Sequence, residues 1–250
     1  MQNCISQRII EVMAPVAQDR TAVDVRIGLI YTSVQLDNGA MGIAWTGKRR
    51  LGGCPSHREP LTGRSAVELL SGLLNADDAV LRSVALATAN ALVATMPKAV
   101  SVSTDILTLL NIQPSEQVTM VGYFGPLLPR LQAIGCHLDI LELKRDFPGT
   151  LTPEQGRGAL SQCDVAIITG TAIVTNTLDE LISNLGMPRA VVLLGPSSLM
   201  CPEVFLASPI THLAGAWVRD PTAVAREISE GGGTKTLKSY LEFATICLQS

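Results

Sequence analysis

The sequence predicts an α/β protein in which a small α+β domain, residues 1–100, precedes a doubly wound parallel sheet of Rossmann-like topology, residues 101–250. In the second half, apolar runs alternate with amphipathic segments, as strands and helices do around a parallel sheet. One run, Val118–Phe124, ends in a glycine turn and an amphipathic segment follows it. Hydrophobic residues make up 47% of the chain and aromatic residues only 4%. Aliphatic side chains must therefore form the core, as in strands that are buried on both faces.

The first hundred residues combine helical and extended patterns. In chain order we expect a helix that Pro15 ends, β-runs over 23–36 and 41–46 joined by a turn at Asp37-Asn38-Gly39, a capping box at Ser65–Glu68, and a long helix over 78–95. The turn residues tolerate positive φ angles, which favours a hairpin. The Ser-x-x-Glu spacing before leucines is typical of a helix start.

The second half repeats a strand and a helix several times. We expect strands over 118–124, 137–143, 164–170, 190–194 and 211–218, and helices that begin at Pro126, Thr177 and Pro221. Proline is favoured in the first helical turn, where its missing N–H costs no hydrogen bond. Gly135 is expected to close the first of these helices. Glu142 lies about 20 residues beyond Gly122, the spacing at which a dinucleotide-binding unit places an acid on the ribose.

Ligands of such sheets bind outside the carboxyl ends of the strands. The residues expected there, and therefore predicted to contact a ligand, are Gly122, Tyr123, Gly125, Glu142, Thr169, Gly170, Thr171, Asn176, Thr177, Gly195, Ser197 and Ser198. Glycine, hydroxyls and backbone N–H groups suit a small anion better than they suit proton transfer. Other interpretations stay open, because the glycines also permit a tight turn, Thr177 also suits a helix cap, and Glu142 also suits a solvated strand end.

Metal-ligating residues are scattered. Cys54 and His57 are the one local pairing, and Cys201 and His212 are distant candidates to join them. A structural zinc site needs four ligands, so this pairing is a weak candidate. The serines lack the G-x-S-x-G pattern of hydrolases. No catalytic residue is assigned on these grounds.

Charge and apolar length bound the partners. The net charge is -3 and basic residues do not cluster among aromatics, so we expect no nucleic-acid partner. No apolar stretch reaches the roughly 18 residues of a membrane span, so we expect no membrane partner. Six separated cysteines and the absence of a secretion signal favour a cytoplasmic protein with reduced thiols.

Several stretches together resemble a family of prokaryotic proteins labelled "putative heavy-metal chelation", of the DUF364/DUF4213 type. The matching stretches are Tyr31–Val34, Gly42–Thr46, Ser83–Leu92, Val121–Phe124, Leu141–Leu143, Asp164–Thr171, Asn176–Leu178, Leu194–Ser198, Leu213–Gly215 and Gly231–Thr234. The resemblance implies an N-terminal domain similar to that of enolases, followed by a Rossmann-like domain. It also implies metal or metallophore handling, with recurrent polar positions at Asn90, Glu142, Thr169, Thr171, Asn176, Thr177, Ser197 and Asp220.

Three functional hypotheses follow. The first is a protein that binds a small anionic ligand or metal chelate in a cleft between its two domains. The second is an enzyme with a nucleotide or S-adenosylmethionine-like cofactor, whose ribose Glu142 would bind. The third is an assembly module with a vestigial cleft. The aliphatic helix around 85–93 suits either a homo-oligomer or an internal domain contact.

Overall fold

The structure, a computed structural model, describes residues 4–47, 59–75, 78–142 and 149–248. The N-terminal elements are α1 (Ile5–Ala17), β1 (Ala22–Ile27), β2 (Tyr31–Leu36), β3 (Met41–Trp45), α2 (Ala66–Leu70), the 3₁₀ helix η1 (Ser71–Leu74) and α3 (Ala79–Val93). The following elements are α4 (Ile106–Leu110), β4 (Gln117–Val121), α5 (Leu128–Ile134), β5 (His137–Leu141), α6 (Pro153–Gln162), β6 (Val165–Thr169), α7 (Thr171–Val174), α8 (Leu178–Ser183), β7 (Ala190–Leu194), α9 (Pro202–Phe205), β8 (His212–Val218), α10 (Pro221–Ser229), α11 (Thr234–Leu237), the 3₁₀ helix η2 (Lys238–Tyr240) and β9 (Leu241–Cys247).

The N-terminal sheet has three antiparallel strands in the order β1-β2-β3. The predicted hairpin turn is confirmed, with Gly39 at a φ of +86°. The single run expected over 23–36 is two strands, because the chain reverses after Gly28, whose N–H donates to the Tyr31 carbonyl at 3.0 Å. Short turns of this kind leave little trace in an apolar stretch.

Two helices pack on this sheet. α1 continues through Pro15 to Ala17, contrary to prediction, because a proline in the last turn removes only one backbone hydrogen bond. Asp78 caps the start of α3, because its carboxylate accepts from the N–H groups of Val80 and Leu81. Most of α3 is buried inside the chain, so its apolar composition is explained by internal packing.

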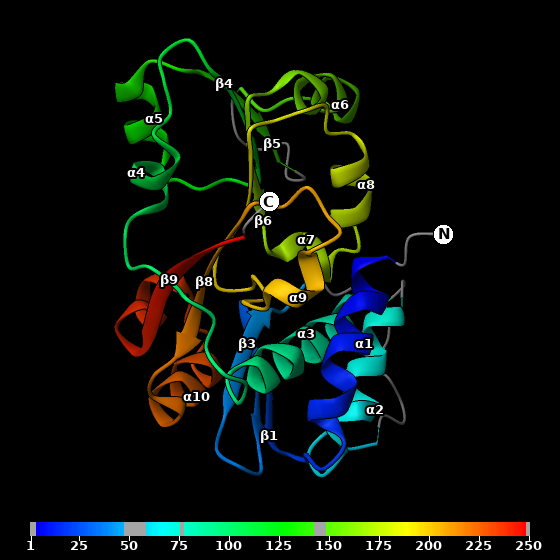
Figure 1. Cartoon of the computed structure of the whole chain (residues 1–250). Helices are drawn as coiled ribbons and strands as arrows, with labels where there is room; N and C mark the ends of the chain where they lie inside the picture. Colours follow the sequence, from blue (N-terminus) through cyan, green and yellow to red (C-terminus); the bar gives the residue numbers. More distant parts are fainter. Residues whose placement is uncertain (1–3, 48–58, 76–77, 143–148, 249–250) are drawn as a thin grey trace.

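The large sheet has six strands in the order β5-β4-β6-β7-β8-β9. The first five are parallel, and β9 pairs antiparallel with β8 at one edge. Because β5 and β6 lie on opposite sides of β4, the strand order reverses there, which makes the β4–β6 boundary the switch point of the sheet. In Figure 1, α7 and α9 lie between this sheet and the N-terminal elements below it.

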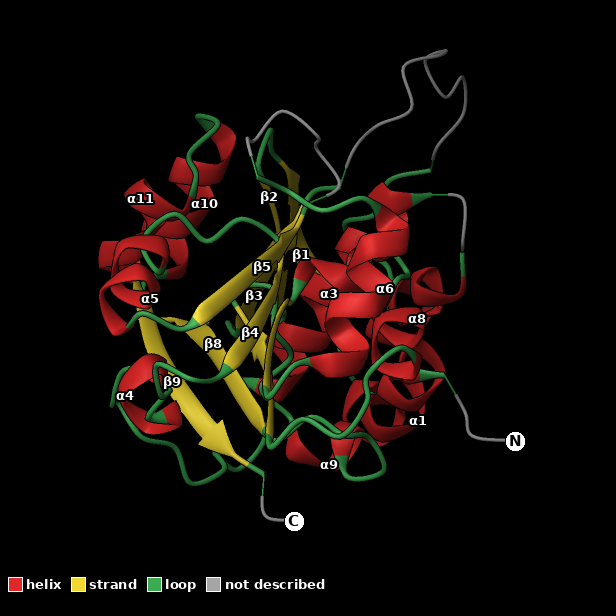
Figure 2. Cartoon of the chain, turned by 90° about the horizontal axis from the view of Figure 1, so that it is seen from above, coloured by secondary structure: helices red, strands yellow, loops and turns green. Residues whose placement is uncertain are grey.

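Helices cover both faces of the large sheet, as Figure 2 shows from above. Val165 and Ile167 of β6 pack in one apolar cluster with α4 and α5, whereas Ala166 and Ile168 pack on the other face. The cluster on that second face also contains residues of α1 and α3, so one core joins the N-terminal elements to the sheet. The predicted fold class, a small α+β part followed by a doubly wound, mostly parallel sheet, is confirmed.

Two details of the second half differ from prediction. β4 ends at Val121, and α5 begins at Leu128 with Pro129 in its first turn, so Pro126 belongs to the connecting turn. The helices α4, α6, α7, α9 and α11 and the edge strand β9 were also not predicted. Gly135 does close α5, at a φ of +80°. No described helix has the length and apolar character needed to cross a membrane.

Candidate functional site

A cavity of about 640 Å³ lies at the carboxyl ends of β4, β5 and β6, next to the switch point. Its walls come from these strand ends, from α6, α7 and α8, and from the end of β3. The lining residues are Trp45, Val121, Gly122, Tyr123, Phe124, Leu141, Glu142, Leu151, Thr152, Arg157, Leu160, Thr169, Thr171, Ala172, Thr175, Thr177, Glu180, Leu181 and Asn184. The cavity therefore lies where doubly wound sheets hold their ligands.

The glycine turn after β4 is not built as a phosphate cradle. Gly122 has a φ of +95° and its N–H donates to the Leu141 carbonyl at 2.8 Å. The next N–H, of Tyr123, donates to Glu142 Oε2 at 3.0 Å. Gly125 does not line the cavity, and the helix that follows has only seven residues. The turn therefore does not lead straight into a helix N-terminus, and a ligand contact at these glycines stays a prediction.

Glu142 lies on the cavity wall and brings its own carboxylate to this turn. A second anion at the Tyr123 N–H would have to displace this carboxylate against electrostatic repulsion. The spacing of Glu142 from Gly122 thus has a structural role, since the acid ties the end of β5 to the end of β4. A ribose contact by Glu142 stays a prediction.

The wall formed by β6, α7 and α8 carries four threonine hydroxyls. Thr169 Oγ1 lies 3.1 Å from Thr171 Oγ1, and Thr175 Oγ1 lies 2.9 Å from Thr177 Oγ1. Thr177 precedes α8 but its side chain makes no capping hydrogen bond, so the predicted cap is wrong and its hydroxyl pairs with Thr175 instead. A hydroxyl both donates and accepts, so this wall suits a polar, uncharged edge of a ligand.

Gly170 and Asn176, also predicted to contact a ligand, lie outside the lining. A Cβ on Gly170 would stand 2.5 Å from the Ser198 backbone nitrogen, so glycine is required there by close packing. Asn176 is exposed and has a φ of +58°, a conformation that asparagine tolerates better than most residues.

The end of β7 packs inside the protein. Gly195, Ser197 and Ser198 were predicted to hold an anion, yet none of them lines the cavity. Ser197 Oγ accepts from the Trp45 N–H at 2.8 Å, and both serines are buried. This segment joins the large sheet to β3, and a ligand contact of these three residues stays a prediction.

Two parts of the cavity wall were missed by sequence reasoning. Trp45 comes from the N-terminal sheet, and nothing in its local pattern distinguishes it from an ordinary strand aromatic. Thr152, Arg157 and Leu160 come from the start and body of α6. Thr152 and Gln155 form a reciprocal capping box, so the signature Thr-Pro-Glu-Gln at 152–155 is the signal that would have found this helix.

Among the described residues of the lining, the charged groups are two carboxylates, Glu142 and Glu180, and one guanidinium, that of Arg157. Arg157 is half-exposed and lies 3.6 Å from Glu154, one turn earlier on α6. A pair at that distance and exposure is weak. The described lining therefore presents mixed charge, and a purely anionic ligand is not what it matches best.

The buried side chain of Arg82 links α3 to α7. This α3 side chain is only 2% exposed and donates to the carbonyls of Ile173 at 2.6 Å and Val174 at 3.0 Å. It also donates to Ser6 Oγ at 2.9 Å and to the Leu73 carbonyl. Burial lowers the pKa of the guanidinium below its ordinary value. The carbonyl end of α7 is thus fixed to the N-terminal elements, which keeps its threonines in the cavity wall.

The described residues contain no group of three or more His, Cys, Asp and Glu side chains able to hold a metal ion. Cys54 and His57 lie outside the described residues. Cys201 is buried with its Sγ 3.1 Å from Glu203 Oε2, and burial raises the pKa of this thiol to about 12. His212 Nδ1 lies 2.8 Å from Thr211 Oγ1, and burial lowers its pKa. Cys201 and His212 therefore form no metal site with each other or with a further described ligand.

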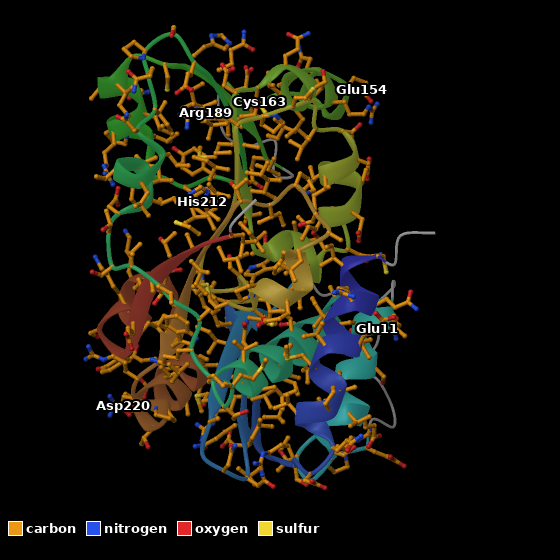
Figure 3. All side chains as sticks on the ribbon, viewed as in Figure 1. Glu11, Glu154, Cys163, Arg189, His212 and Asp220 are labelled. Atoms are coloured by element: carbon orange, nitrogen blue, oxygen red, sulfur yellow. The ribbon has the colours of Figure 1, made fainter. Side chains whose placement is uncertain are left out.

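Two further polar positions have structural roles. Asn90 Nδ2 donates to the Ile43 carbonyl at 2.9 Å and lies outside the cavity lining. Asp220 caps α10 by accepting from the Ala223 N–H at 3.0 Å. Figure 3 shows Asp220 at the opposite corner of the molecule from Glu154 of α6. Neither residue contributes to the cavity.

The comparisons with known proteins agree with this architecture. The family model DUF364, described as "Putative heavy-metal chelation", matches residues 105–247, and DUF4213, with the same description, matches residues 10–93. A curated relative, an uncharacterized protein of Methanocaldococcus jannaschii, is 25% identical over 86% of both chains.

Two solved structures of DUF364 proteins of unknown function have the same fold. The one from Pyrococcus horikoshii has a TM-score of 0.83 and 23% identity, and the match covers 98% of this chain and 100% of that one. The one from Desulfitobacterium hafniense has a TM-score of 0.81 and 23% identity, with 97% of each chain covered.

Proposed function

Because the chain belongs to the DUF364 family, which is described as "Putative heavy-metal chelation", we propose that it binds a small organic molecule in the cavity beside β4 and β6. We propose further that a heavy metal handled by this protein arrives already bound to such a molecule, as a chelate. The observation that carries the proposal is the cavity itself, with its volume of about 640 Å³ and its hydroxyl-rich wall.

The size and place of the cavity support a small-molecule site. Ligand pockets of proteins typically measure roughly 300–1,000 Å³ and combine apolar walls with a few polar groups. Here Val121, Leu141 and Leu160 are among the apolar residues, and the four threonines provide polar contacts. The position at the switch point is where the sheet topology places ligands.

The chemistry of the lining supports a chelate over a bare ion. Soft heavy metals prefer thiolate and imidazole ligands. The described lining contains neither cysteine nor histidine, and its hydroxyls are neutral. An organic chelator would satisfy the metal and present its own outer oxygens to those hydroxyls.

The proposal includes a cleft between two domains, 1–100 and 101–250. The two family models meet between residues 93 and 105, and each sheet is built from one side of that boundary. Trp45 comes from the first part and the rest of the described lining from the second. The division stays a prediction, since one apolar core runs through both parts.

A second candidate function is an enzyme with a nucleotide or S-adenosylmethionine-like cofactor. The observation in its favour is Glu142, an acid at the end of the strand next to β4, on the cavity wall. Dinucleotide-binding sheets place their ribose-binding acid at the corresponding strand end. Against it, the N–H groups of Gly122 and Tyr123 are already bonded.

A thermal-shift panel on the metal-stripped full chain separates these functions. The probes are Zn²⁺ alone, Zn²⁺ with citrate, nitrilotriacetate or dipicolinate, ATP, and S-adenosylmethionine. A ligand at a hundred times its Kd stabilises the fold by about 2.7 kcal/mol. We expect a shift with at least one zinc chelate beyond that with Zn²⁺ alone. We expect Thr171→Val to reduce it and Thr222→Val, a threonine exposed on α10, to leave it unchanged.

Two outcomes would contradict the first proposal. One is no shift with any chelate, and the other is a chelate shift that Thr171→Val does not alter. A shift with ATP or S-adenosylmethionine that disappears in Glu142→Ala supports the enzyme instead. Glu142→Gln serves as its control, because the amide oxygen still accepts from the Tyr123 N–H.

A further inference from the structure

Resting on the proposed function, we infer that the ligand of this cavity contains a flat, unsaturated ring that lies against an aromatic wall. The chain has only two tryptophans, three tyrosines and four phenylalanines. Among the described residues, one of each lines the cavity, namely Trp45, Tyr123 and Phe124. In a chain with so few aromatic residues, this gathering at one cavity from two distant segments indicates a role in recognition.

Trp45 is held in place at both of its backbone polar atoms. Its N–H donates to Ser197 Oγ at 2.8 Å, and its carbonyl accepts from Ser83 Oγ at 2.7 Å. The first serine follows β7 and the second belongs to α3, so two separate elements fix the same residue. A side chain on a fixed backbone loses little further freedom when a ligand packs on it.

Phe124 fits against two glycines with positive φ. A Cβ on Gly122 would lie 3.7 Å from its Cε2 atom, and a Cβ on Gly195 would lie 3.9 Å from its Cε1 atom. The φ angles at these glycines are +95° and +114°. Both glycine-ended strands thus contact one aromatic ring, and the positive φ angles favour glycine at their ends.

Tyr123 is the third aromatic residue of the lining. It is 42% exposed, which is high for a large ring that lines a cavity. Its backbone N–H is held by Glu142. Aromatic rings gain more from offset or edge-to-face contact with another ring than area burial alone provides. A ligand ring seated here would cover Tyr123 and meet such partners.

The threonines of the lining suit the substituents of a ring. The hydroxyls of Thr169, Thr171, Thr175 and Thr177 pair with one another, and a hydroxyl can also donate to or accept from the oxygens and nitrogens of a ring. Arg157 adds one guanidinium for a carboxylate. An aromatic chelator and a nucleobase both have this chemistry, a flat ring with polar edges, so the experiment must distinguish them.

The test uses tryptophan fluorescence of the full chain. The chain has two tryptophans, and Trp217 stacks against Lys98 outside the cavity lining. In Trp217→Phe, Trp45 is therefore the single reporter. We would titrate this variant with zinc dipicolinate, zinc nitrilotriacetate and adenosine; Zn²⁺ has a closed shell and does not itself quench the emission. The Trp45→Phe variant, which keeps Trp217, is the control that shows whether the fluorescence change comes from Trp45. The Tyr123→Leu variant tests whether the Tyr123 ring contributes to binding.

We expect zinc dipicolinate or adenosine to quench Trp45 and to bind at least tenfold more tightly than zinc nitrilotriacetate. Tyr123→Leu, measured on Trp45, should weaken ring binding about three- to tenfold. If adenosine binds more tightly than zinc dipicolinate, the inference of a ring in the ligand is supported, and the ring is assigned to a nucleobase.

If the two chelates bind equally tightly and Thr171→Val weakens both, the inference of a ring in the ligand is wrong. The proposed function, binding of a metal chelate, is then still supported. Failure of every probe to bind overturns both. Ring binding unchanged by Tyr123→Leu also contradicts this inference, whether or not Trp45→Phe folds.

Discussion

The carboxyl edge of the large sheet has two halves, a hollow half that borders a cavity and a filled half that packs against other parts of the chain. At the ends of β4 and β6 it is hollow, and Gly122 and Thr169 line a cavity. At the end of β7 it is filled, and Ser197 binds the backbone of Trp45. Both halves carry a positive-φ glycine followed by polar or aromatic residues. What distinguishes them is whether a segment from elsewhere in the chain covers the strand end.

This difference predicts two kinds of mutational effect. Buried side chains at the end of β7, and Arg82 with its hydrogen bonds to α7, should contribute to the free energy of unfolding. Their hydrogen bonds to protein groups replace hydrogen bonds to water. Side chains of the hollow half should contribute to binding and little to stability. Each prediction below tests one side of that division.

Arg82→Met should have the largest effect. It leaves the carbonyls of Leu73, Ile173 and Val174 without their buried donor. Each unpaired buried group costs about 1–3 kcal/mol, partly offset because the guanidinium no longer has to be desolvated. We expect a net loss of roughly 3 kcal/mol in urea unfolding.

The matched control is Arg130→Met, which removes an exposed pair with Asp105 at 2.6 Å. Exposed pairs contribute about 0.2–1 kcal/mol. If the two variants lose equal stability, the hydrogen bonds of Arg82 to α7 contribute no more than an exposed ion pair, and the structural role given to Arg82 is wrong.

The reactivity of the Cys201 thiol measures how often the filled half opens to solvent. Burial raises the pKa of its thiol from 9.0 to about 12, so at pH 8 its thiolate fraction is lower by about a thousandfold. Because the folded state keeps this proton, the contribution to stability is full below pH 9.0 and is lost as the pH rises toward 12.

We expect iodoacetamide at pH 8 to label the exposed Cys4 and Cys247 long before Cys201, as peptide mapping would show. In urea, Cys201 should react like the others. Labelling of native Cys201 together with the exposed thiols would mean that this half opens readily.

Ser197→Ala should cost about 1–2 kcal/mol, because the Trp45 N–H loses its acceptor. The neighbouring Ser198 is the matched control. Its Oγ is fully buried and has no hydrogen-bond partner among the described residues. Ser198→Ala should therefore be neutral or stabilising. Equal losses in the two variants would contradict the contact of Ser197 with Trp45.

The strands of the large sheet could be predicted because buried aliphatic runs such as Val165–Ile168 carry the signal locally. Gly122, Tyr123, Glu142, Thr169, Thr171 and Thr177 were correctly expected at the carboxyl edge for the same reason, since topology alone places them there. Their role in binding stays a prediction.

The rest depended on contacts between distant residues. Trp45 and Ser197 are separated by 152 positions, and no local pattern records that they meet. The sequence therefore identified the residues of the edge but not the segment that covers half of it. α6 was a different failure, because its capping box at Thr152 was present in the sequence and was overlooked.

Thr171→Val should have the smallest effect on stability and a clear effect on binding. Its hydroxyl bonds to Thr169 at 3.1 Å on a half-buried wall, so we expect a loss below about 1 kcal/mol. If the hydroxyl contacts a ligand, the same change weakens binding about fivefold, which is close to 1 kcal/mol. Urea unfolding and calorimetric titration with a zinc chelate on the same sample measure both quantities. A large loss of stability with unchanged affinity would place Thr171 with Ser197, in the part of the edge that holds the fold together, and would show that the hollow half is not the binding half.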